Sequence, residues 1–562
     1  MKKILSILTT GALLAMSACT ELAEEPHSII TAGDYGTTDA QLETVIGRTY
    51  ASLRGAGYGD GGNGYIFSEF LFFLSALSSD EAVLPAMNNG ADWYDGGRNE
   101  EILQHRWTPQ NVEILGAWRY AYNGIATANA AIYQLEAAPA DDKLKAQLIA
   151  EMRTVRAWYY FRLLDWFGNV PLVTDFIDLS LPETRPRAEV YAFVEKELDE
   201  IIKSNVLPTT GHSTRITQDA AKCLLARLYL NAEVFSGTPQ WQKCLEVCNT
   251  IDGRTLTSDY FDNFKPGNGS LPEIIFSIPL PENEWLNPYG YMLLTTKGVQ
   301  WTQVNKADLE KLGELEVTKE NEDGVSVVYK IYEDPYPNYY ADAGVICVQP
   351  GFYTNTFTDA NDKRREAILA GPQYYADGAP IYIVTPTDAY TYIAAPQSGE
   401  TSPLIYRDGE NLKDRQPLEG YCWNKYRLTP DYEWTHIYYG GKPYADFVIF
   451  RYAEVLLMKA ECLVRLTRAG EAGTALQPIY SRAGASPITS PTLQEIEGEW
   501  TREFVLEDQR RTHMIRFGTF TNADHYRGDK TPVTVKDPYT TLFPVPYLEL
   551  AKNNRLKQND GY

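Results

Sequence analysis

The sequence has little of the side chains that usually carry metal, redox or nucleophilic chemistry. It holds 6 histidines and 7 cysteines in 562 residues. Apart from Cys244 and Cys248, no cysteine or histidine pair stands at the spacing of a metal site. A P-loop, a G-x-S-x-G elbow and an H-E-x-x-H motif are also missing. The sequence therefore gives no grounds for a catalytic residue, a cofactor or a resident metal.

Basic side chains are scarce relative to acidic ones. Against 51 Lys and Arg there are 74 Asp and Glu, and the formal net charge is −23. So acidic a chain repels phosphate groups, which argues against nucleic acid and anionic lipid as partners.

Long apolar runs are missing after the first residues, so no later segment is predicted to span a membrane. The chain starts with Lys2 and Lys3, an apolar stretch and small residues before Cys19, a pattern typical of a secretory signal over residues 1–18. The letters MSAC at its end resemble a bacterial lipobox, which implies cleavage before Cys19, lipidation of its thiol and a tether over residues 19–37. The alternative is an ordinary secreted protein with a cysteine at its cleavage site.

The remaining cysteines are scattered, which excludes a small disulfide-framed fold. We expect them to be small buried residues, with one disulfide as the alternative. They are Cys223, Cys244, Cys248, Cys347, Cys422 and Cys462.

Apolar residues recur at helical spacing in two parts of the chain, and turn-forming residues dominate between them. Loop-rich sections with short possible strands are predicted at about 54–109 and 252–444. The predicted helices are 38–53, 110–136, 142–167, 187–203, 217–235, 239–251, 445–466, 471–482 and 493–517.

Segments 221–251 and 453–483 look alike, each being a helix with Ala and Leu on one face, a Gly-containing break and a second helix. This is the pattern of tetratricopeptide-like helix pairs, although their full consensus is missing. Such pairs bury their apolar faces by stacking on one another. We therefore predict a mainly α protein: an α/α-superhelical scaffold over about 38–53, 110–251 and 445–520, with an irregular loop-rich region lying over it.

The stretch NNGADWYDGGRNE, residues 88–100, sets Trp93 and Tyr94 among turn-forming and acidic residues. Aromatic faces suit the C–H surfaces of sugars, while neighbouring polar groups bridge hydroxyls. Trp93 with Asp92, Asp95 and Asn99 could form such a site. Alternatively Trp93 plugs the loop onto the body, since tryptophan is usually buried.

A second aromatic cluster stands in the middle section, with Trp285, Tyr289 and Trp301. The aromatic residues of 153–167 lie on a periodic helix instead, where core packing is the stronger expectation.

Several long blocks together resemble the SusD/RagB family of surface lipoproteins in Bacteroidota nutrient-uptake systems. They are RTVRAWYYFRLLDWFGNVPLVTD at 153–175, FRYAEVLLMKAECLVR at 450–465, REFVLEDQRRTHMIRFGTF at 502–520 and the C-terminal LFPVPYLELAKNNRLKQNDGY. With the lipobox and the stretch around Trp93, the resemblance covers nearly the whole mature chain as a single domain over 38–562.

The resemblance implies a non-enzymatic protein of the outer membrane, lipid-anchored and facing the cell exterior. It would capture oligosaccharide and deliver it to a SusC-like TonB-dependent transporter. Trp93, Asp95 and Asn99 match the family's glycan-binding pattern best, and Trp285, Tyr289 and Trp301 match it less well. Tyr94 and Asp92 are further candidate contacts, and Tyr94 is the ring expected to pack inside its own loop.

Charged residues of the helical blocks, such as Arg156, Glu454 and Arg511, are expected to pair within the scaffold, with a transporter-facing role as the alternative. A lipoprotein that binds peptide or protein through its helix pairs is the second functional hypothesis, and a glycosidase is the third.

Overall fold

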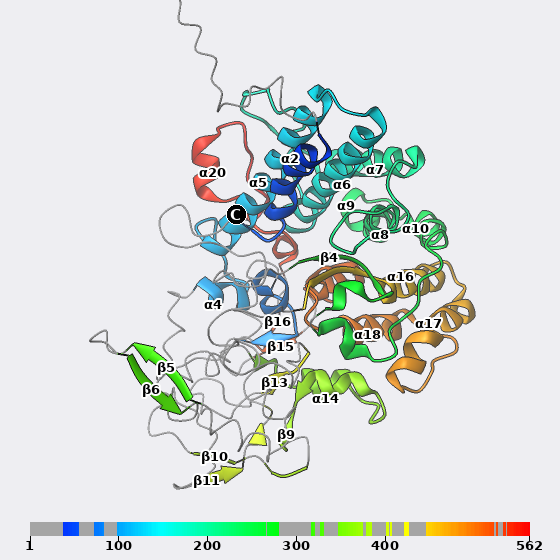
Figure 1. Ribbon diagram of the computed structural model, residues 1–562. Helices are drawn as coiled ribbons and strands as arrows, with labels where there is room; N and C mark the ends of the chain where they lie inside the picture. Colours follow the sequence, from blue (N-terminus) through cyan, green and yellow to red (C-terminus); the bar gives the residue numbers. More distant parts are fainter. Residues whose placement is uncertain are drawn as a thin grey trace, which may run out of the picture.

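The computed structural model describes most of the helical scaffold and selected parts of the loop-rich sections (Figure 1). The described residues are 38–55, 72–83, 98–265, 267–279, 316–320, 326–330, 347–374, 378–380, 382–384, 401–403, 405–406, 408, 421–425, 445–521, 524–526, 532–534 and 537–562. The predicted signal, Cys19 and the tether lie outside them.

The first helices begin where capping residues stand in the sequence. Thr38 caps the first helix by a capping box with Gln41, and the two longest helices are capped by Asn111 and Asp141, which satisfy otherwise unpaired backbone N–H groups. These helices pack side by side in the upper part of Figure 1. They are α2 (Asp39–Ser52), α5 (Val112–Ala137) and α6 (Asp142–Trp166).

The scaffold continues as stacked helices that join the two ends of the chain. α6 packs on α7, α7 on α8, α8 on α10, and α10 on α16, so the two similar segments 221–251 and 453–483 lie directly against each other (Figure 1). This confirms the predicted tetratricopeptide-like scaffold. The helices are α7 (Arg187–Ser204), α8 (Gln218–Leu230), α9 (Ala232–Ser236), α10 (Trp241–Cys248), α16 (Tyr452–Arg465), α17 (Ala469–Ala483), α18 (Leu493–Glu503) and α19 (Arg510–Phe517).

The prediction of a helix over 445–466 is wrong for the residues before α16, which begins at Tyr452. Strand β14 (Phe447–Arg451) occupies the first turns and pairs antiparallel with β4 (Ile274–Ile278). Both strands are buried along their whole length, and such continuous apolar runs do not reveal by periodicity whether they are helical.

The predicted helix 493–517 is interrupted between α18 and α19. Leu506 and Asp508 there have φ values of 56° and 61°, which an α-helix cannot accommodate. The predicted helix 217–235 also breaks, at Asn231 between α8 and α9.

Short elements make up the described parts of the loop-rich sections, where each strand pairs antiparallel with one partner. The remaining strands are β1 (Ala82–Val83), β2 (Val170–Pro171), β3 (Thr184–Arg185), β5 (Glu316–Glu320), β6 (Ser326–Lys330), β7 (Cys347–Val348), β8 (Ile368–Leu369), β9 (Gly371–Pro372), β10 (Tyr382–Val384), β11 (Thr401–Pro403), β12 (Ile405–Tyr406), β13 (Cys422–Trp423), β15 (Asp524–Tyr526) and β16 (Pro532–Thr534). The short helices are η1 (Phe72–Leu77), α4 (Arg98–Leu103), η2 (Tyr260–Phe264), η3 (Asn268–Ser270), α14 (Phe352–Thr356), η5 (Lys363–Ala367), η7 (Pro538–Thr541) and α20 (Tyr547–Lys552).

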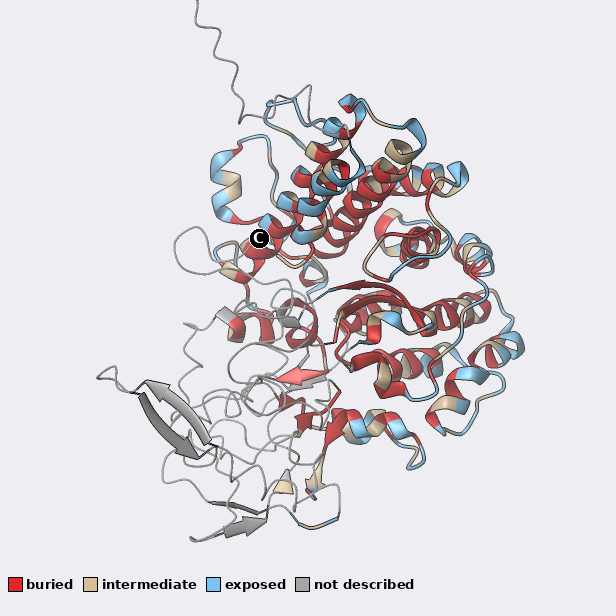
Figure 2. Cartoon of the chain, viewed as in Figure 1, coloured by how far each residue is buried: buried red, intermediate tan, exposed pale blue. Residues whose placement is uncertain are grey.

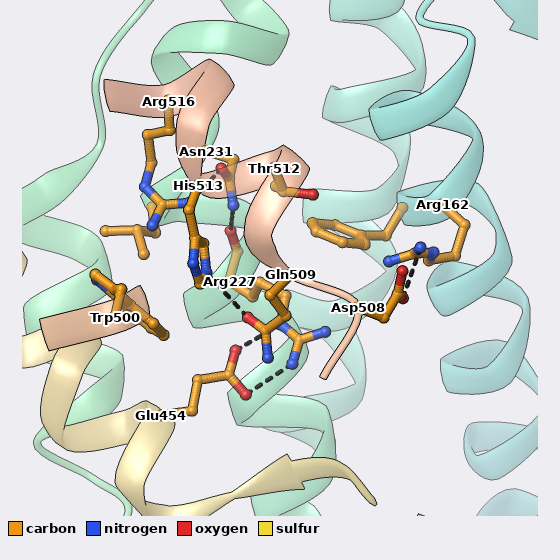
Figure 3. A pocket seen from close by; sticks show the side chains of 12 residues that line it. Arg162, Arg227, Asn231, Glu454, Trp500, Asp508, Gln509, Thr512, His513 and Arg516 are labelled. Atoms are coloured by element: carbon orange, nitrogen blue, oxygen red, sulfur yellow. Dashed lines mark hydrogen bonds and ion pairs between the residues drawn. The ribbon is translucent and has the colours of Figure 1, made fainter. Parts of the chain in front are cut away.

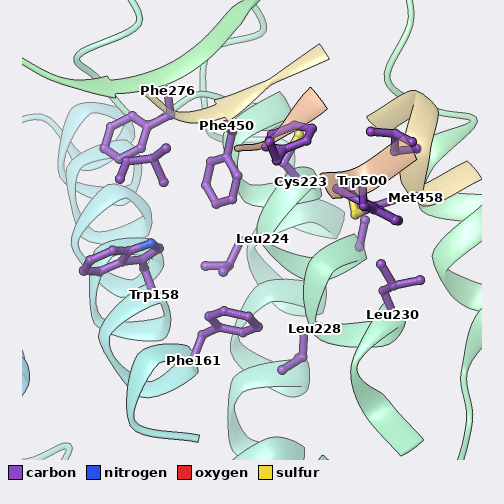
Figure 4. Packing of buried hydrophobic residues seen from close by; sticks show 14 of the residues in the cluster. Trp158, Phe161, Cys223, Leu224, Leu228, Leu230, Phe276, Phe450, Met458 and Trp500 are labelled. Carbon is purple, nitrogen blue, oxygen red and sulfur yellow. The ribbon is translucent and has the colours of Figure 1, made fainter. Parts of the chain in front are cut away.

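The core runs through the helical scaffold, with exposed residues at its periphery (Figure 2). Trp158 and Phe161 of α6 face Leu224 of α8 beneath Phe276 and Phe450 of the β4/β14 pair (Figure 4). The aromatic residues of 158–167 are buried, as predicted. The cysteines after Cys19 are all buried, as expected. Among the described helices, none is long and apolar enough to cross a bilayer.

Gly124 allows α5 and α6 to approach closely. A Cβ added at Gly124 would lie 2.0 Å from the Tyr159 ring, and Tyr159 is held by its hydroxyl, 2.8 Å from Ser52 Oγ. We expect Gly124→Ala to lower the free energy of unfolding by about 1–3 kcal/mol, measured by urea denaturation. Gly47→Ala in α2 is the matched control, because a Cβ added there would have no atom within 4 Å apart from its chain neighbours and the local helix backbone. Equal losses of unfolding free energy in Gly124→Ala and Gly47→Ala would contradict the close approach of α5 and α6 as the cause.

Candidate functional site

Most residues of the predicted glycan site lie outside the described residues. They are Asp92, Trp93, Tyr94, Asp95, Trp285, Tyr289 and Trp301. Asn99 is described, and it differs from the expectation. It lies in α4 with its side chain fully buried, so it presents no exposed amide to a ligand. We therefore remove Asn99 from the proposed ligand contacts.

The described residues before and after segment 84–97 are firmly held. β1 pairs with β7, with Val83 opposite Cys347, and the N–H of Gln349 donates to the carbonyl of Glu81 at 2.9 Å. On the other side, the His105 ring lies 2.7 Å from the Ser78 carbonyl oxygen. The segment that contains Trp93 thus lies between β1 and α4, whose residues Val83 and Asn99 are buried, and such a placement suits a binding role.

The same strands connect segment 84–97 to the middle section. The N–H of Val348 in β7 donates to the carbonyl of Tyr421, the residue before β13, at 3.0 Å. β13 in turn pairs with β8. Parts of both loop-rich sections therefore meet at β1, β7 and β13. In the middle section Tyr374 is 51% exposed. Tyr374 was not among the predicted site residues, although its Gly- and Pro-rich neighbourhood was a signal for a surface turn.

Arg451, the last residue of β14, stands at the centre of a buried cluster of charges. Its guanidinium donates to Glu273 at 3.0 Å, to Glu503 at 2.5 Å and to Glu507 at 2.7 Å. Arg482 also donates to Glu273 and Glu503. We call these residues, with Lys425 and Arg364, the Arg451 cluster. Lys425 contacts Glu507 and Arg364 contacts Glu503.

Two carboxyl groups of the Arg451 cluster, those of Glu503 and Glu273, stay ionised. Burial by itself would raise the pKa of the Glu503 carboxyl, but Arg482, Arg451 and Arg364 hold this pKa well below its ordinary value. Arg482 and Arg451 lower the pKa of Glu273 against its burial in the same way. Carboxylates that are paired, ionised and shielded from solvent are unsuited to proton transfer. The cluster is therefore structural, and it joins the scaffold to the loop-rich region.

A small polar cavity lies between α6, α8, α16, α18 and α19 (Figure 3). Arg227 pairs with Glu454 at 2.6 Å and Arg162 pairs with Asp508 at 2.8 Å. Burial and the nearby arginines hold the pKa of His513 well below its ordinary value, so the ring stays neutral. The cavity volume is about 10 Å³, room for one water molecule but not for a sugar ring.

The charged residues of the helical blocks pair inside the scaffold, as expected. Arg156 donates to Glu197, Glu454 accepts from Arg227, and Arg511 lies 3.5 Å from a carboxylate oxygen of Asp165. Within the described residues, no group of three or more His, Cys, Asp or Glu side chains could hold a metal ion.

Two family models match separate stretches of the chain. Residues 349–562 match the model of the SusD family, and residues 74–230 match a model described as starch-binding and associating with the outer membrane. The chain belongs to the SusD family. The stretch around Trp93 falls inside a match, whereas Trp285, Tyr289 and Trp301 fall between the two.

Similar proteins cover nearly the full length of this SusD-family chain. The starch-binding protein SusD of Bacteroides thetaiotaomicron is 26% identical over 88% of this chain and 86% of its own. Surface glycan-binding protein A from Bacteroides fluxus shares the fold with a TM-score of 0.65 at 21% identity, covering 94% of this chain and 100% of that one. The Bacteroides thetaiotaomicron protein of that name, solved with laminarihexaose, has a TM-score of 0.64 at 21% identity, covering 93% of this chain and 100% of that one.

Proposed function

We propose that this chain is a non-enzymatic lipoprotein at the outer face of the outer membrane, anchored through Cys19. It captures oligosaccharide and delivers it to a SusC-like TonB-dependent transporter. The observation that carries the proposal is the similarity to a starch-binding protein along most of both chains. A solved relative that carries laminarihexaose supports the same ligand class.

The oligosaccharide would bind in the loop-rich region rather than in the scaffold. The interior of the described scaffold is filled by apolar side chains and paired charges, and its small polar cavity has no room for a sugar ring. Trp93 is the leading candidate for the stacking ring, with Asp92 and Asp95 as hydroxyl partners. Its segment lies between β1 and α4, both held on the core. Tyr94 is assigned to packing, and Trp285, Tyr289 and Trp301 form a second candidate cluster.

Trp93→Ala is expected to weaken oligosaccharide binding about tenfold, which corresponds to about 1.4 kcal/mol. The reason is that one stacking face is lost while the hydroxyl partners stay. Isothermal titration with maltohexaose and laminarihexaose measures the effect. Tyr133→Ala is the matched control, because Tyr133 is an exposed ring (46%) on the scaffold helix α5.

A stability measurement separates a binding role of Trp93 from a packing role. An unchanged unfolding midpoint with weaker binding supports a ligand contact. A loss of about 3–5 kcal/mol in the free energy of unfolding, typical of a buried tryptophan, would assign Trp93 to packing.

The alternative functions make different predictions in the same assays. A peptide-binding lipoprotein would bind no oligosaccharide of a broad panel and would bind extended peptides instead. A glycosidase would release reducing sugar from these oligosaccharides when purified. Saturable oligosaccharide binding without release of reducing sugar supports the proposal against both.

A further inference from the structure

A protein that delivers ligand to a transporter needs a surface that contacts the transporter. Arg156, Glu454 and Arg511 are 6%, 1% and 1% exposed and pair within the scaffold, so they cannot form that surface. Apolar side chains that the described scaffold leaves exposed are the better candidates for that surface.

The loop between β2 and β3 carries such side chains in close succession. Phe176, Ile177, Leu179 and Leu181 are 45%, 63%, 93% and 50% exposed, and we call them the apolar ridge. Single exposed leucines are ordinary on protein surfaces, but apolar side chains gathered on one loop mark an interaction site.

The backbone of the loop is held in place on both sides of the ridge. Asp175 accepts from the N–H of Ile177 at 2.9 Å, and Asp178 accepts from the N–H of Ser180 at 2.9 Å. Further along, the Leu181 carbonyl accepts from Arg555 at 2.8 Å. A loop fixed in this way loses little conformational entropy when it docks, which favours tight association.

The ridge lies at the end of the scaffold where the described chain begins, at Thr38. The Phe176 ring packs on Tyr133 of α5 at a centroid distance of 5.6 Å. Leu42, near the start of α2, packs in one cluster with Leu135 at the end of α5, and α2 and α5 lie side by side in Figure 1. The tether over residues 19–37 reaches at most about 65 Å when extended. A tether of this reach allows the ridge to approach the membrane surface and the proteins embedded in it.

Two occupants fit an apolar surface near a membrane, namely the lipid itself and a membrane protein. Asp178 stands between the exposed Ile177 and Leu179 and is itself fully exposed, and its hydrogen bonds to Ser180 lower its pKa. An ionised carboxylate at the tip of the ridge is costly to place among lipid chains. A protein can instead meet it with a basic side chain or an N–H donor.

We propose that the apolar ridge docks this chain onto the extracellular surface of its transporter, in an apolar groove that carries a basic group opposite Asp178. This inference rests on the proposed function and adds the surface through which delivery takes place.

The test compares the full-length, affinity-tagged chain with Ile177→Ser/Leu179→Ser after expression in its own bacterium. Each is purified from detergent-solubilised outer membranes, and the TonB-dependent transporter that accompanies it is quantified by mass spectrometry. We expect the double variant to retain about a tenth or less of the transporter. Tyr374→Ser, which removes an exposed ring far along the chain in the middle section, is expected to retain all of it. Oligosaccharide affinity should be unchanged in the double variant, because its substitutions are at exposed positions of the scaffold.

The outcomes distinguish this inference from the proposed function. If the wild type and the double variant recover equal amounts of transporter, the docking role of the ridge is wrong and the proposed function is unaffected. If no transporter is recovered with the wild type or any variant, both the proposed delivery to a transporter and the docking role of the ridge are wrong. The proposal of oligosaccharide binding is not affected by that result. Ridge-dependent binding to protein-free vesicles of outer-membrane lipids also overturns the inference, because it would assign the ridge to lipid.

Discussion

Replacing Arg451 with methionine is expected to lower the free energy of unfolding by about 3–5 kcal/mol, because carboxylates that lose a buried partner remain charged in a medium that solvates them poorly. Arg451 is fully buried and contacts Glu273, Glu503 and Glu507. Its guanidinium also donates to the backbone carbonyl of Glu503 at 2.7 Å. Methionine fills part of the volume and replaces none of these bonds. Urea denaturation followed by tryptophan fluorescence measures the change.

The matched control is Arg468→Met. Arg468 forms an ion pair with Glu471 at 2.6 Å, but the two side chains are 44% and 60% exposed. Exposed pairs contribute about 0–1 kcal/mol, since water and salt screen them. Similar losses in both variants would show that the Arg451 cluster does not hold the fold together in the way proposed.

The expected loss is large because the cluster joins parts of the chain that are far apart in sequence. Glu273 precedes β4, Arg451 ends β14, and Glu503 ends α18. Lys425 of the middle section donates to the carbonyl of Val505 and to Glu507. The cluster therefore fixes the loop-rich region on the scaffold, which is where the proposed ligand site requires a rigid base.

The helices were predictable because their signals are local. α2, α5 and α6 begin one residue after Thr38, Asn111 and Asp141, which are all strong capping residues. β14 was missed because its identity as a strand depends on β4, which lies far away in sequence. The break after α18 was missed because no glycine marks it, and its positive φ values fall on Leu506 and Asp508.

The candidate site was less predictable than the scaffold. Asn99 stood beside turn-forming residues, and only the structure shows that α4 begins at Arg98 and buries the Asn99 side chain. The pairing of Arg156, Glu454 and Arg511 was expected, but their partners Glu197, Arg227 and Asp165 could not be chosen among so many charged residues. Choosing them needs the three-dimensional packing of α6, α7, α8, α16 and α19.

Glu81 makes the free energy of unfolding decrease as pH rises. Its side chain is 1% exposed, and its carboxylate oxygen accepts from the N–H of Leu506 at 3.2 Å. Burial and the neighbouring charge of Asp80 raise the pKa of Glu81 from the ordinary 4.5 to about 8. In the unfolded chain Glu81 loses its proton near its ordinary pKa, so the folded state holds one more proton between about pH 5 and pH 8. This contribution therefore lowers the stability as pH rises through that window and is constant above it.

Glu81→Gln is expected to remove this dependence. A pKa shift of one unit corresponds to about 1.4 kcal/mol, and relaxation around the ionised carboxyl reduces the full value. We expect the variant to gain about 2–4 kcal/mol relative to wild type between pH 5 and pH 8.5, measured by urea denaturation at a series of pH values. Glutamine keeps an oxygen that can accept from Leu506, so the variant tests the charge rather than the hydrogen bond.

Glu471→Gln is the control for this pH series. Glu471 is exposed, and its hydrogen bond from Arg468 lowers its pKa, so it is ionised in both states above pH 5 and its substitution should change the stability equally across the window. A constant difference between Glu81→Gln and wild type would mean that Glu81 is already ionised in the folded protein. A difference that grows with pH would show that the Glu81 carboxyl is neutral in the folded protein. Glu81 directly precedes β1, after which the segment with Trp93 begins. Protonation of this buried residue would then be connected to the base of the proposed binding loop.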